Sequence, residues 1–382
     1  MAELVINFEG SSVAAKAGLT ELGRLRIEDG TIAEVSPASS EVQPDFVGVT
    51  VIPGFVDIHN HGAFGVDVNS ASADELISTS QRLASEGVAG WVPTLVPDTD
   101  GNYARAIAQI DYAMERQKGE PIAQILGVHY EGVFAAEKMC GALRPEYFKA
   151  YSPGVVKTLP TLTQGVHMTT MAPEIEGGID LIREFAGDGW VVSIGHTRAR
   201  RDVLDAAFDA GVRHATHFFN AMTGIHHRDL GVAGWCLAKP GMTFDIIADG
   251  IHVDPTMVEM AVRGRGTRNV ALISDSISAA GMGDGSFDLW GQTIEVHDGR
   301  TRNAKGGIAG SVITLGDAVR SMARLGFSVE QIAAMSSTNA ARLLGLENEF
   351  GRVEVGRRAD LVALNTAGEL IFSMIGGEIV TQ

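Results

Sequence analysis

Short apolar runs alternate with amphipathic stretches through the middle of the chain. The stretches at 73–86, 103–116, 179–185, 201–210 and 255–262 place apolar residues at helical spacing. Eight runs have the length and apolar character of buried strands: "FVDIHNH" (55–61), "GWVPTLV" (90–96), "ILGVHYE" (125–131), "VHMTTMAPE" (166–174), "VVSIGHT" (191–197), "HATHFFN" (214–220), "TFDIIADG" (243–250) and "VALISDS" (270–276). Strands that alternate with helices predict βα units around a parallel sheet.

The two ends of the chain follow a different pattern. Residues 24–35, "RLRIEDGTIAEV", alternate around an Asp-Gly pair, which is typical of a β-hairpin. The segments "GRVEVGRRADLVALN" and "ELIFSMIGGEIV" near the C-terminus are also strand-like, with glycine turns. We therefore predict that residues 1–52 and 353–382 pair into one small β-sandwich domain made from both ends.

The eight runs between these ends predict a TIM (β/α)8 barrel over residues 53–352. A doubly wound open sheet is the main alternative, because it uses the same βα units. No G-x-G-x-x-G follows the first run and no Walker A sequence occurs, so the nucleotide-binding motifs typical of open sheets do not support it.

Composition narrows the class of partner. The chain has 382 residues, of which 45% are hydrophobic and 20% charged, and a formal net charge of −17. A surface with this much negative charge argues against binding to nucleic acids or anionic membranes, but it is compatible with a small phosphorylated ligand. With two cysteines, Cys140 and Cys236, no basic leader and no apolar run near the roughly 18 residues of a membrane helix, we expect a reduced, cytoplasmic protein.

Two histidines stand one residue apart at the end of the first barrel run. An extended strand turns alternate side chains to the same face, so His59 and His61 would point the same way. The pair could hold a metal ion together. Taken alone, it is equally compatible with a polar loop.

Polar residues also end several of the later runs. The third run carries His129 and Glu131, while His196, His217 and Asp275 end the fifth, sixth and eighth. The C-terminal ends of barrel strands meet at one mouth, and buried polar groups are costly unless they are paired. A divalent metal would pair them. Imidazole and carboxylate ligands suit zinc best, with iron, manganese and cobalt as alternatives.

In this order, the motifs resemble the amidohydrolase superfamily and, within it, the N-acetylglucosamine-6-phosphate deacetylases. The resemblance runs nearly end to end and is carried by "PGFVDIHNHG", "GVHYEGVF", "SIGHT", "HATHFFNAM", "IADGIHVD", "LISDSISAAGM", "GGIAGSVITL" and "STNAARLLGL". The stretches "HFFNAM" and "ADGIHVD" favour the deacetylases over dihydroorotase-like relatives. Those relatives usually carry a metal-bridging carboxylated lysine on strand four, and "VHMTTMAPE" contains no lysine.

The resemblance implies a centre of one or two divalent ions. Glu131, His196 and His217 would hold the main ion. His59 and His61, with Glu131 bridging, would complete a second site. Asp275 would act first as general base and then as general acid.

The resemblance also implies contacts to substrate. His252 would touch the substrate, and the phosphate would meet Asn220 and Ala221 through backbone groups and also Arg228. A planar guanidinium donates two parallel hydrogen bonds to phosphate, which favours this role for Arg228 over the alternative of a solvated loop charge. Cys140 could help shape the pocket if its loop closes over the site, or it could be a passive loop thiol.

Two positions depart from the family pattern. Val133 follows Glu131-Gly132 where the family usually has proline, which could loosen the loop without changing the chemistry. Leu143 stands where the family usually has a histidine that is thought to touch the substrate. Because leucine cannot donate a hydrogen bond, either another group substitutes or the substrate preference has shifted.

The reaction implied by the resemblance is metal-dependent hydrolysis of the acetamide of N-acetylglucosamine 6-phosphate, giving glucosamine 6-phosphate and acetate. Another N-acetylated amino-sugar phosphate, such as N-acetylgalactosamine 6-phosphate, or a different amide is the alternative. A metal-bound structural or regulatory protein without turnover is a third reading. Members of the family tend to be homodimers that complete the phosphate pocket across the interface.

Overall fold

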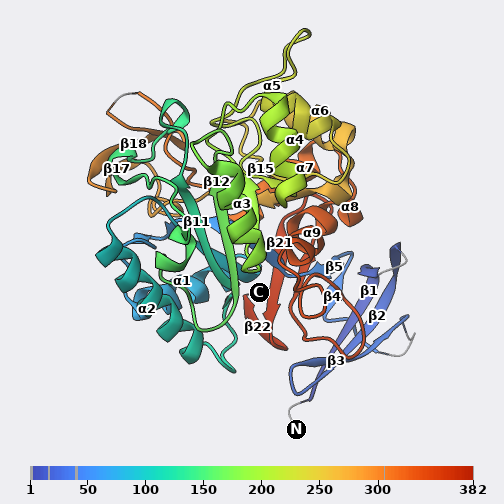
Figure 1. Ribbon diagram of the computed structural model, residues 1–382. Helices are drawn as coiled ribbons and strands as arrows, with labels where there is room; N and C mark the ends of the chain where they lie inside the picture. The colour runs from blue at the N-terminus through green and yellow to red at the C-terminus, as the bar shows by residue number, and fades with distance from the viewer. Residues whose placement is uncertain (1–2, 16–17, 39–41, 305, 382) are drawn as a thin grey trace.

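Eight parallel strands close into a barrel in the computed structural model, which describes residues 3–15, 18–38, 42–304 and 306–381 (Figure 1). The barrel strands are β6 (Phe55–Asn60), β9 (Val88–Leu95), β11 (Gly127–Phe134), β12 (Val166–Met171), β13 (Val191–Ile194), β14 (His214–Ala215), β15 (Thr243–Ile247) and β16 (Val270–Ile273). Strand β6 pairs with β9, and the order then runs from β9 through β11 to β16. The short β10 (Gln124–Ile125) also pairs with β9.

The barrel closes between its first and last strands. The amide of His61 donates to the carbonyl of Ser276 at 2.8 Å, and the amide of Asp275 donates to the carbonyl of His59 at 3.0 Å. A closed ring of eight strands confirms the predicted TIM barrel and excludes the open doubly wound sheet. Strands β9 and β11 are buried at every position, as expected for parallel strands covered on both faces.

Helices cover the outside of the barrel (Figure 1). They are α1 (Ala73–Ser85), α2 (Asp100–Arg116), α3 (Gly178–Gly187), α4 (Arg201–Ala210), α5 (Gly231–Ala238), α6 (Pro255–Arg265), α7 (Leu315–Arg324), α8 (Val329–Ala333) and α9 (Asn339–Leu343). The hydrophobic pattern located α1 to α4 and α6, but α2 begins three residues earlier than predicted because the Thr99 side chain caps it by accepting from the amide of Asn102. No helix of the described chain has both the length and the apolar character needed to cross a membrane.

Strands from both ends of the chain form a second, eight-stranded sheet. It consists of β1 (Glu3–Ala15), β2 (Gly18–Glu28), β3 (Thr31–Ser36), β4 (Phe46–Val47), β5 (Thr50–Pro53), β20 (Leu361–Leu364), β21 (Leu370–Ile375) and β22 (Glu378–Thr381). Strand β5 pairs with β20, and β2 and β3 form the predicted hairpin, so the expected pairing of the two ends is confirmed. The limits of two separate domains at 1–52 with 353–382 and at 53–352 stay a prediction.

A small insertion follows the last barrel strand. It is an antiparallel sheet of β17 (Gly285–Leu289), β18 (Gln292–His297) and β19 (Arg300–Arg302). A second short pair, β7 (Gly62–Ala63) and β8 (Val66–Asp67), follows β6. Neither feature was predicted from the sequence, and both lie next to the mouth of the barrel.

Gly87 lies where the barrel and the terminal sheet meet, with φ of +90°. A Cβ atom there would lie 2.8 Å from Phe55 Cε2 and 3.0 Å from Val362 Cγ1. We expect Gly87→Ala to destabilise the fold by roughly 2–4 kcal/mol, through left-handed backbone strain and overpacking. Gly119→Ala is the matched control, because Gly119 has φ of +81° and nothing within 4 Å of the added Cβ. Equal losses of thermal stability in the two variants would contradict the packing argument.

Candidate active site

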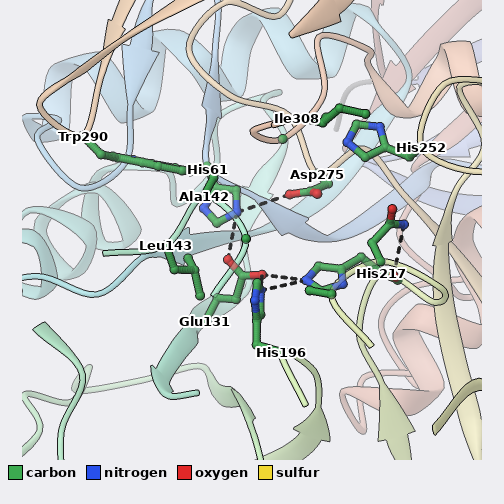
Figure 2. A pocket seen from close by; sticks show the side chains of 14 residues that line it. His61, Glu131, Ala142, Leu143, His196, His217, His252, Asp275, Trp290 and Ile308 are labelled. Carbon is green, nitrogen blue, oxygen red and sulfur yellow. Dashed lines mark hydrogen bonds and ion pairs between the residues drawn. The ribbon is translucent and has the colours of Figure 1, made fainter. Parts of the chain in front are cut away.

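Six acidic and imidazole side chains gather at the C-terminal mouth of the barrel. His59 and His61 come from the end of β6, and Glu131 comes from β11. His196, His217 and Asp275 each stand two residues beyond the end of a strand, namely β13, β14 and β16. Figure 2 shows His61, Glu131, His196, His217 and Asp275 together. The sequence-predicted metal ligands and general base therefore do lie together.

One group of donor atoms is formed by His59, His61 and Asp275. The Nε2 atoms of the two histidines are 3.1 Å apart. Oδ1 of Asp275 lies 3.4 Å from Nε2 of His59 and 3.3 Å from Nε2 of His61. All three side chains are buried.

The second group is formed by Glu131, His196 and His217. Oε1 of Glu131 lies 3.0 Å from Nε2 of His196 and 2.9 Å from Nε2 of His217, and these two nitrogens are 3.1 Å apart. Glu131 also joins the first group, because its Oε2 lies 3.3 Å from Nε2 of His61. Its carboxylate therefore stands between the two sets of histidines.

These spacings fit coordinated metal ions. Ligand atoms about 2.0–2.1 Å from a tetrahedral ion lie about 3.3 Å from one another. Each group places three donor atoms within 4.8 Å of one another, and imidazole with carboxylate is a donor set that zinc and similar divalent ions accept.

Backbone carbonyls orient two of the histidine rings. Nδ1 of His61 donates to the carbonyl of Thr94 at 3.1 Å, and Nδ1 of His196 donates to the carbonyl of Met139 at 2.8 Å. With the proton on Nδ1, the Nε2 lone pair of the neutral ring points into the site. Metal-binding histidines usually have a partner of this kind on their other nitrogen.

The carboxylates give the site a strong preference for positive charge. Burial alone would lower the pKa of His61, but hydrogen bonds to Asp275 and Glu131 outweigh burial and raise its pKa to about 10. Burial is likewise outweighed at His217, where Glu131 raises the pKa to about 9. Burial would raise the pKa of Glu131 and of Asp275, yet the neighbouring histidines hold the pKa of Glu131 well below its usual range and lower that of Asp275. A divalent cation would satisfy the same electrostatic demand.

Three of the six residues have left-handed backbone conformations. The φ angles are +48° at His196, +33° at His217 and +49° at Asp275. Non-glycine residues in this region carry a cost of order 1–3 kcal/mol each, and such strain is found where a side chain must be aimed. Here it turns three side chains inward directly after their strands end.

His129 belongs to the same strand-end pattern but not to the cluster. Its ring is fully buried, with Nε2 2.7 Å from Oγ1 of Thr170 and Nδ1 3.3 Å from the carbonyl of Ile58. Burial lowers its pKa well below the usual value, so the ring is neutral. It packs edge-to-face against His59, with 4.8 Å between ring centroids, and supports that ring from within the barrel.

A pocket of about 160 Å³ opens over the cluster. Of the predicted substrate-binding residues, Asn220, Ala221 and His252 line it. Nδ1 of His252 lies 2.7 Å from Oδ2 of Asp249, which fixes the orientation of the ring. Leu143 lines the pocket as well, so the departure from the family pattern lies at the site itself.

Two other predicted substrate-binding residues lie outside this lining. Arg228 belongs to the exposed segment 224–230, which forms the projecting loop near α5 at the top of Figure 1. Its guanidinium is 2.6 Å from Nε2 of His227. Cys140 directly precedes the lining residues Gly141 to Leu143 but is not one of them. The substrate roles of Arg228 and Cys140 stay predictions.

Several lining residues were not predicted from the sequence, and Trp290 is the largest of them. It occupies the turn between β17 and β18, and its ring packs edge-to-face against His61, with 5.2 Å between centroids. Ala142 and Ile308 also line the pocket. None of them ends a barrel strand, so a search of strand ends could not find them. The Trp290-Gly291 turn was a local hairpin signal, but nothing in it places the hairpin over the mouth.

Comparison with known proteins gives full-length matches. A protein named N-acetylglucosamine-6-phosphate deacetylase from Bacillus subtilis (strain 168) is 34% identical over 94% of this chain and 92% of its own length. A protein named N-acetylgalactosamine-6-phosphate deacetylase from Escherichia coli O157:H7 is also 34% identical, over 96% of this chain and 98% of its own.

Solved structures of proteins with the deacetylase name also share the fold of this chain. A solved structure of a Mycobacterium smegmatis N-acetyl-D-glucosamine-6-phosphate deacetylase variant, in complex with N-acetyl-D-glucosamine-6-phosphate, superposes with a TM-score of 0.90. It is 29% identical, and the match covers 100% of both chains. The family model described as the amidohydrolase family matches residues 50–380. This protein therefore belongs to the amidohydrolase family.

Proposed function

We propose that this protein hydrolyses the acetamide of N-acetylglucosamine 6-phosphate to glucosamine 6-phosphate and acetate. The observation that carries the proposal is the buried cluster of four histidines and two carboxylates beneath a pocket at the barrel mouth. Its support from relatives is broad, because full-length relatives from bacteria and mammals carry the deacetylase name.

The proposed centre holds two divalent ions, with zinc as the metal. Glu131, His196 and His217 would hold one ion, and His59 and His61 the other, with Glu131 between them. Such ions would lower the pKa of a neighbouring water to about 7 and withdraw charge from the amide carbonyl.

Asp275 is the proposed proton carrier. Its lowered pKa keeps the carboxylate ionised near neutral pH, ready to accept a proton from the attacking water. As the water oxygen bonds to the acetyl carbon, the proton passes to Asp275. The C–N bond then breaks, and Asp275 returns the proton to the leaving amine nitrogen. Its backbone is held by the hydrogen bond from its amide to the carbonyl of His59, which fixes the carboxylate relative to β6.

The phosphate end of the substrate would bind on the side of Asn220, Ala221 and His252. The exposed loop carrying Arg228 does not line this chain's pocket, so we propose a homodimer in which each loop reaches the partner's site. Ile225 and Leu230 support this proposal, because both are exposed apolar side chains on the same loop, with 51% and 40% of their surface accessible.

N-acetylgalactosamine 6-phosphate is the second candidate substrate. The specific observation in its favour is the Escherichia coli O157:H7 relative named for that sugar, which matches this chain over almost its full length. Acetate release should be measured with both epimers on one preparation of purified protein. Turnover of N-acetylglucosamine 6-phosphate with the higher kcat/KM supports the proposal. Preference for the galactosamine epimer would replace it, and no acetate from either would refute both.

Asp275→Asn should keep the fold and the bound metal but lower kcat by about 10²–10⁴-fold, because the amide cannot accept the proton from water. Metal content and kcat should be measured on the same sample. Asp298→Asn, on an exposed turn of the insertion sheet, is a control with no expected change. A variant with near-normal kcat would assign the base to another group.

His61→Ala should remove one ion of the proposed pair and leave the other. The remaining set of Glu131, His196 and His217 is intact in this variant. Elemental analysis should therefore give close to two metal ions per wild-type chain and close to one per variant chain. One ion in the wild-type protein would leave the deacetylase proposal standing and contradict the second metal site.

Arg228→Ala should raise KM for the phosphorylated sugar with little change in kcat, because a remote phosphate contact positions the substrate. The unphosphorylated sugar should be unaffected. Arg324→Ala, another exposed arginine, is the matched control. If the loss were the same for both sugars, Arg228 would not contact the phosphate.

A further inference from the structure

The pocket over the metal-ligand cluster has two chemically different sides. Figure 2 shows Trp290, Ala142 and Leu143 together beside His61 and Glu131, with His217, His252 and the apolar Ile308 on the opposite side. Asn220 and Ala221 line the pocket on the His217 side, where the chain turns directly after β14. We call the surface formed by Ala142, Leu143 and Trp290 the apolar wall.

Leu143 is held firmly in this wall. It is 6% exposed and packs in a hydrophobic cluster with Val96, Ala135, Phe148 and Trp290. A Cβ atom on Gly132 would lie 2.2 Å from Leu143 Cδ1, so the leucine rests on the backbone that follows Glu131. A side chain so packed cannot move aside for a larger ligand without disturbing the strand that carries Glu131.

Trp290 is also fixed in place. Its Nε1 donates to Oδ1 of Asp67 at 3.2 Å, which ties the inserted hairpin to the residues after β6. Because its ring packs against the ring of His61, the wall directly borders the proposed metal ligands. The apolar wall therefore has a defined shape, built from two separate loops.

The planarity of the amide decides which end of the substrate meets this wall; this step rests on the proposed function. A trans secondary amide directs its two carbon substituents to opposite ends of the group. With the carbonyl carbon at the cluster and the sugar on the side of Asn220 and His252, the acyl chain must point towards the other side. The surface there is apolar, and Leu143 offers no hydrogen bond to a sugar hydroxyl.

We propose that the apolar wall is the acyl-binding surface of the enzyme and that Leu143 limits the length of the acyl group it accepts. The methyl of an acetyl group contacts Leu143 and Trp290. An additional methylene meets the Leu143 side chain, which has no room to withdraw. Leu143 is therefore a specificity-determining residue for the acyl group, while the opposite side of the pocket selects the sugar.

The test uses N-acetyl, N-propionyl and N-butyryl glucosamine 6-phosphate, with release of the carboxylic acid as the readout. Leu143→Ala should raise the ratio of kcat/KM for propionyl over acetyl by about four-fold or more, since burying one methylene is worth about 0.8 kcal/mol. Leu143→Val, a smaller change that is safer for folding, should give an intermediate rise.

Leu162→Ala is the matched control, because Leu162 is also 6% exposed and does not line the pocket. It should leave the ratio unchanged even if it lowers stability. The inference is overturned if Leu143→Ala and Leu143→Val lower kcat/KM for all three substrates by the same factor, since that marks a purely structural leucine. If the wild-type protein releases acid from none of the three substrates, the proposed function is wrong and this inference is wrong with it. That result differs from an equal loss in the two Leu143 variants, which would overturn this inference alone.

Discussion

The carboxylate of Glu131 is the interaction on which the rest of the site depends. Nε2 atoms of four histidines from three segments of the barrel lie within 3.5 Å of its two oxygens. A buried carboxylate surrounded in this way is stable only if positive charge is shared among its neighbours, whether by protons or by metal ions. Its place in the middle of a strand that is buried at every position means that the charge cannot move away from the histidines around it.

The barrel supplies the rigidity that this arrangement needs. Beneath the cluster, Asp57 accepts hydrogen bonds from the hydroxyl of Ser274 at 2.6 Å and its amide at 3.2 Å, which ties the first barrel strand to the residues before Asp275. The amide of His217 donates to Asp245, whose other oxygen lies 2.9 Å from Nε2 of His214. These contacts hold the left-handed turns after β14 and β16, so the strain at His217 and Asp275 is offset by bonds between neighbouring strands.

Most of the residues of the cluster could be predicted from the sequence, because the C-terminal ends of all eight barrel strands meet at one mouth. Once eight strands are recognised, a histidine or carboxylate at a strand end is expected at the mouth, and His59, His61, His196, His217 and Asp275 all lie there. Glu131 lies there too, although β11 continues three residues beyond the predicted strand end, to Phe134. His129 shows the limit of the rule, since its side chain points into the barrel one turn of the pleat below Glu131. The two side chains lie two residues apart on the same face of β11, so their depth along the strand, and not the alternation, separates them.

The features of the site that could not be predicted from the sequence lie in the loops and the inserted hairpin. Trp290 lines the pocket only because the hairpin of β17 and β18 folds back over the mouth. Arg228 does not line the pocket, because it belongs to the exposed loop of residues 224–230. The path of such loops is set by long-range contacts. One example is the hydrogen bond between Trp290 and Asp67, which are 223 positions apart along the chain. No local pattern encodes a contact of that range.

The choice between sugar epimers must also be made by a few polar contacts. The two candidate substrates share the phosphate and the acetamide, so neither a phosphate contact nor the apolar wall can tell them apart. A site that hydrogen-bonds a substrate hydroxyl rejects the epimer lacking it there, because its own polar group is then left unpaired. Asn220 and His252 are the polar side chains of the pocket outside the metal-ligand cluster, and Asp249 holds His252 in one orientation. In the proposed binding mode the sugar lies on this side, and a ring fixed in this way cannot turn to follow a displaced hydroxyl, which makes His252 a candidate for sugar selectivity together with Asn220.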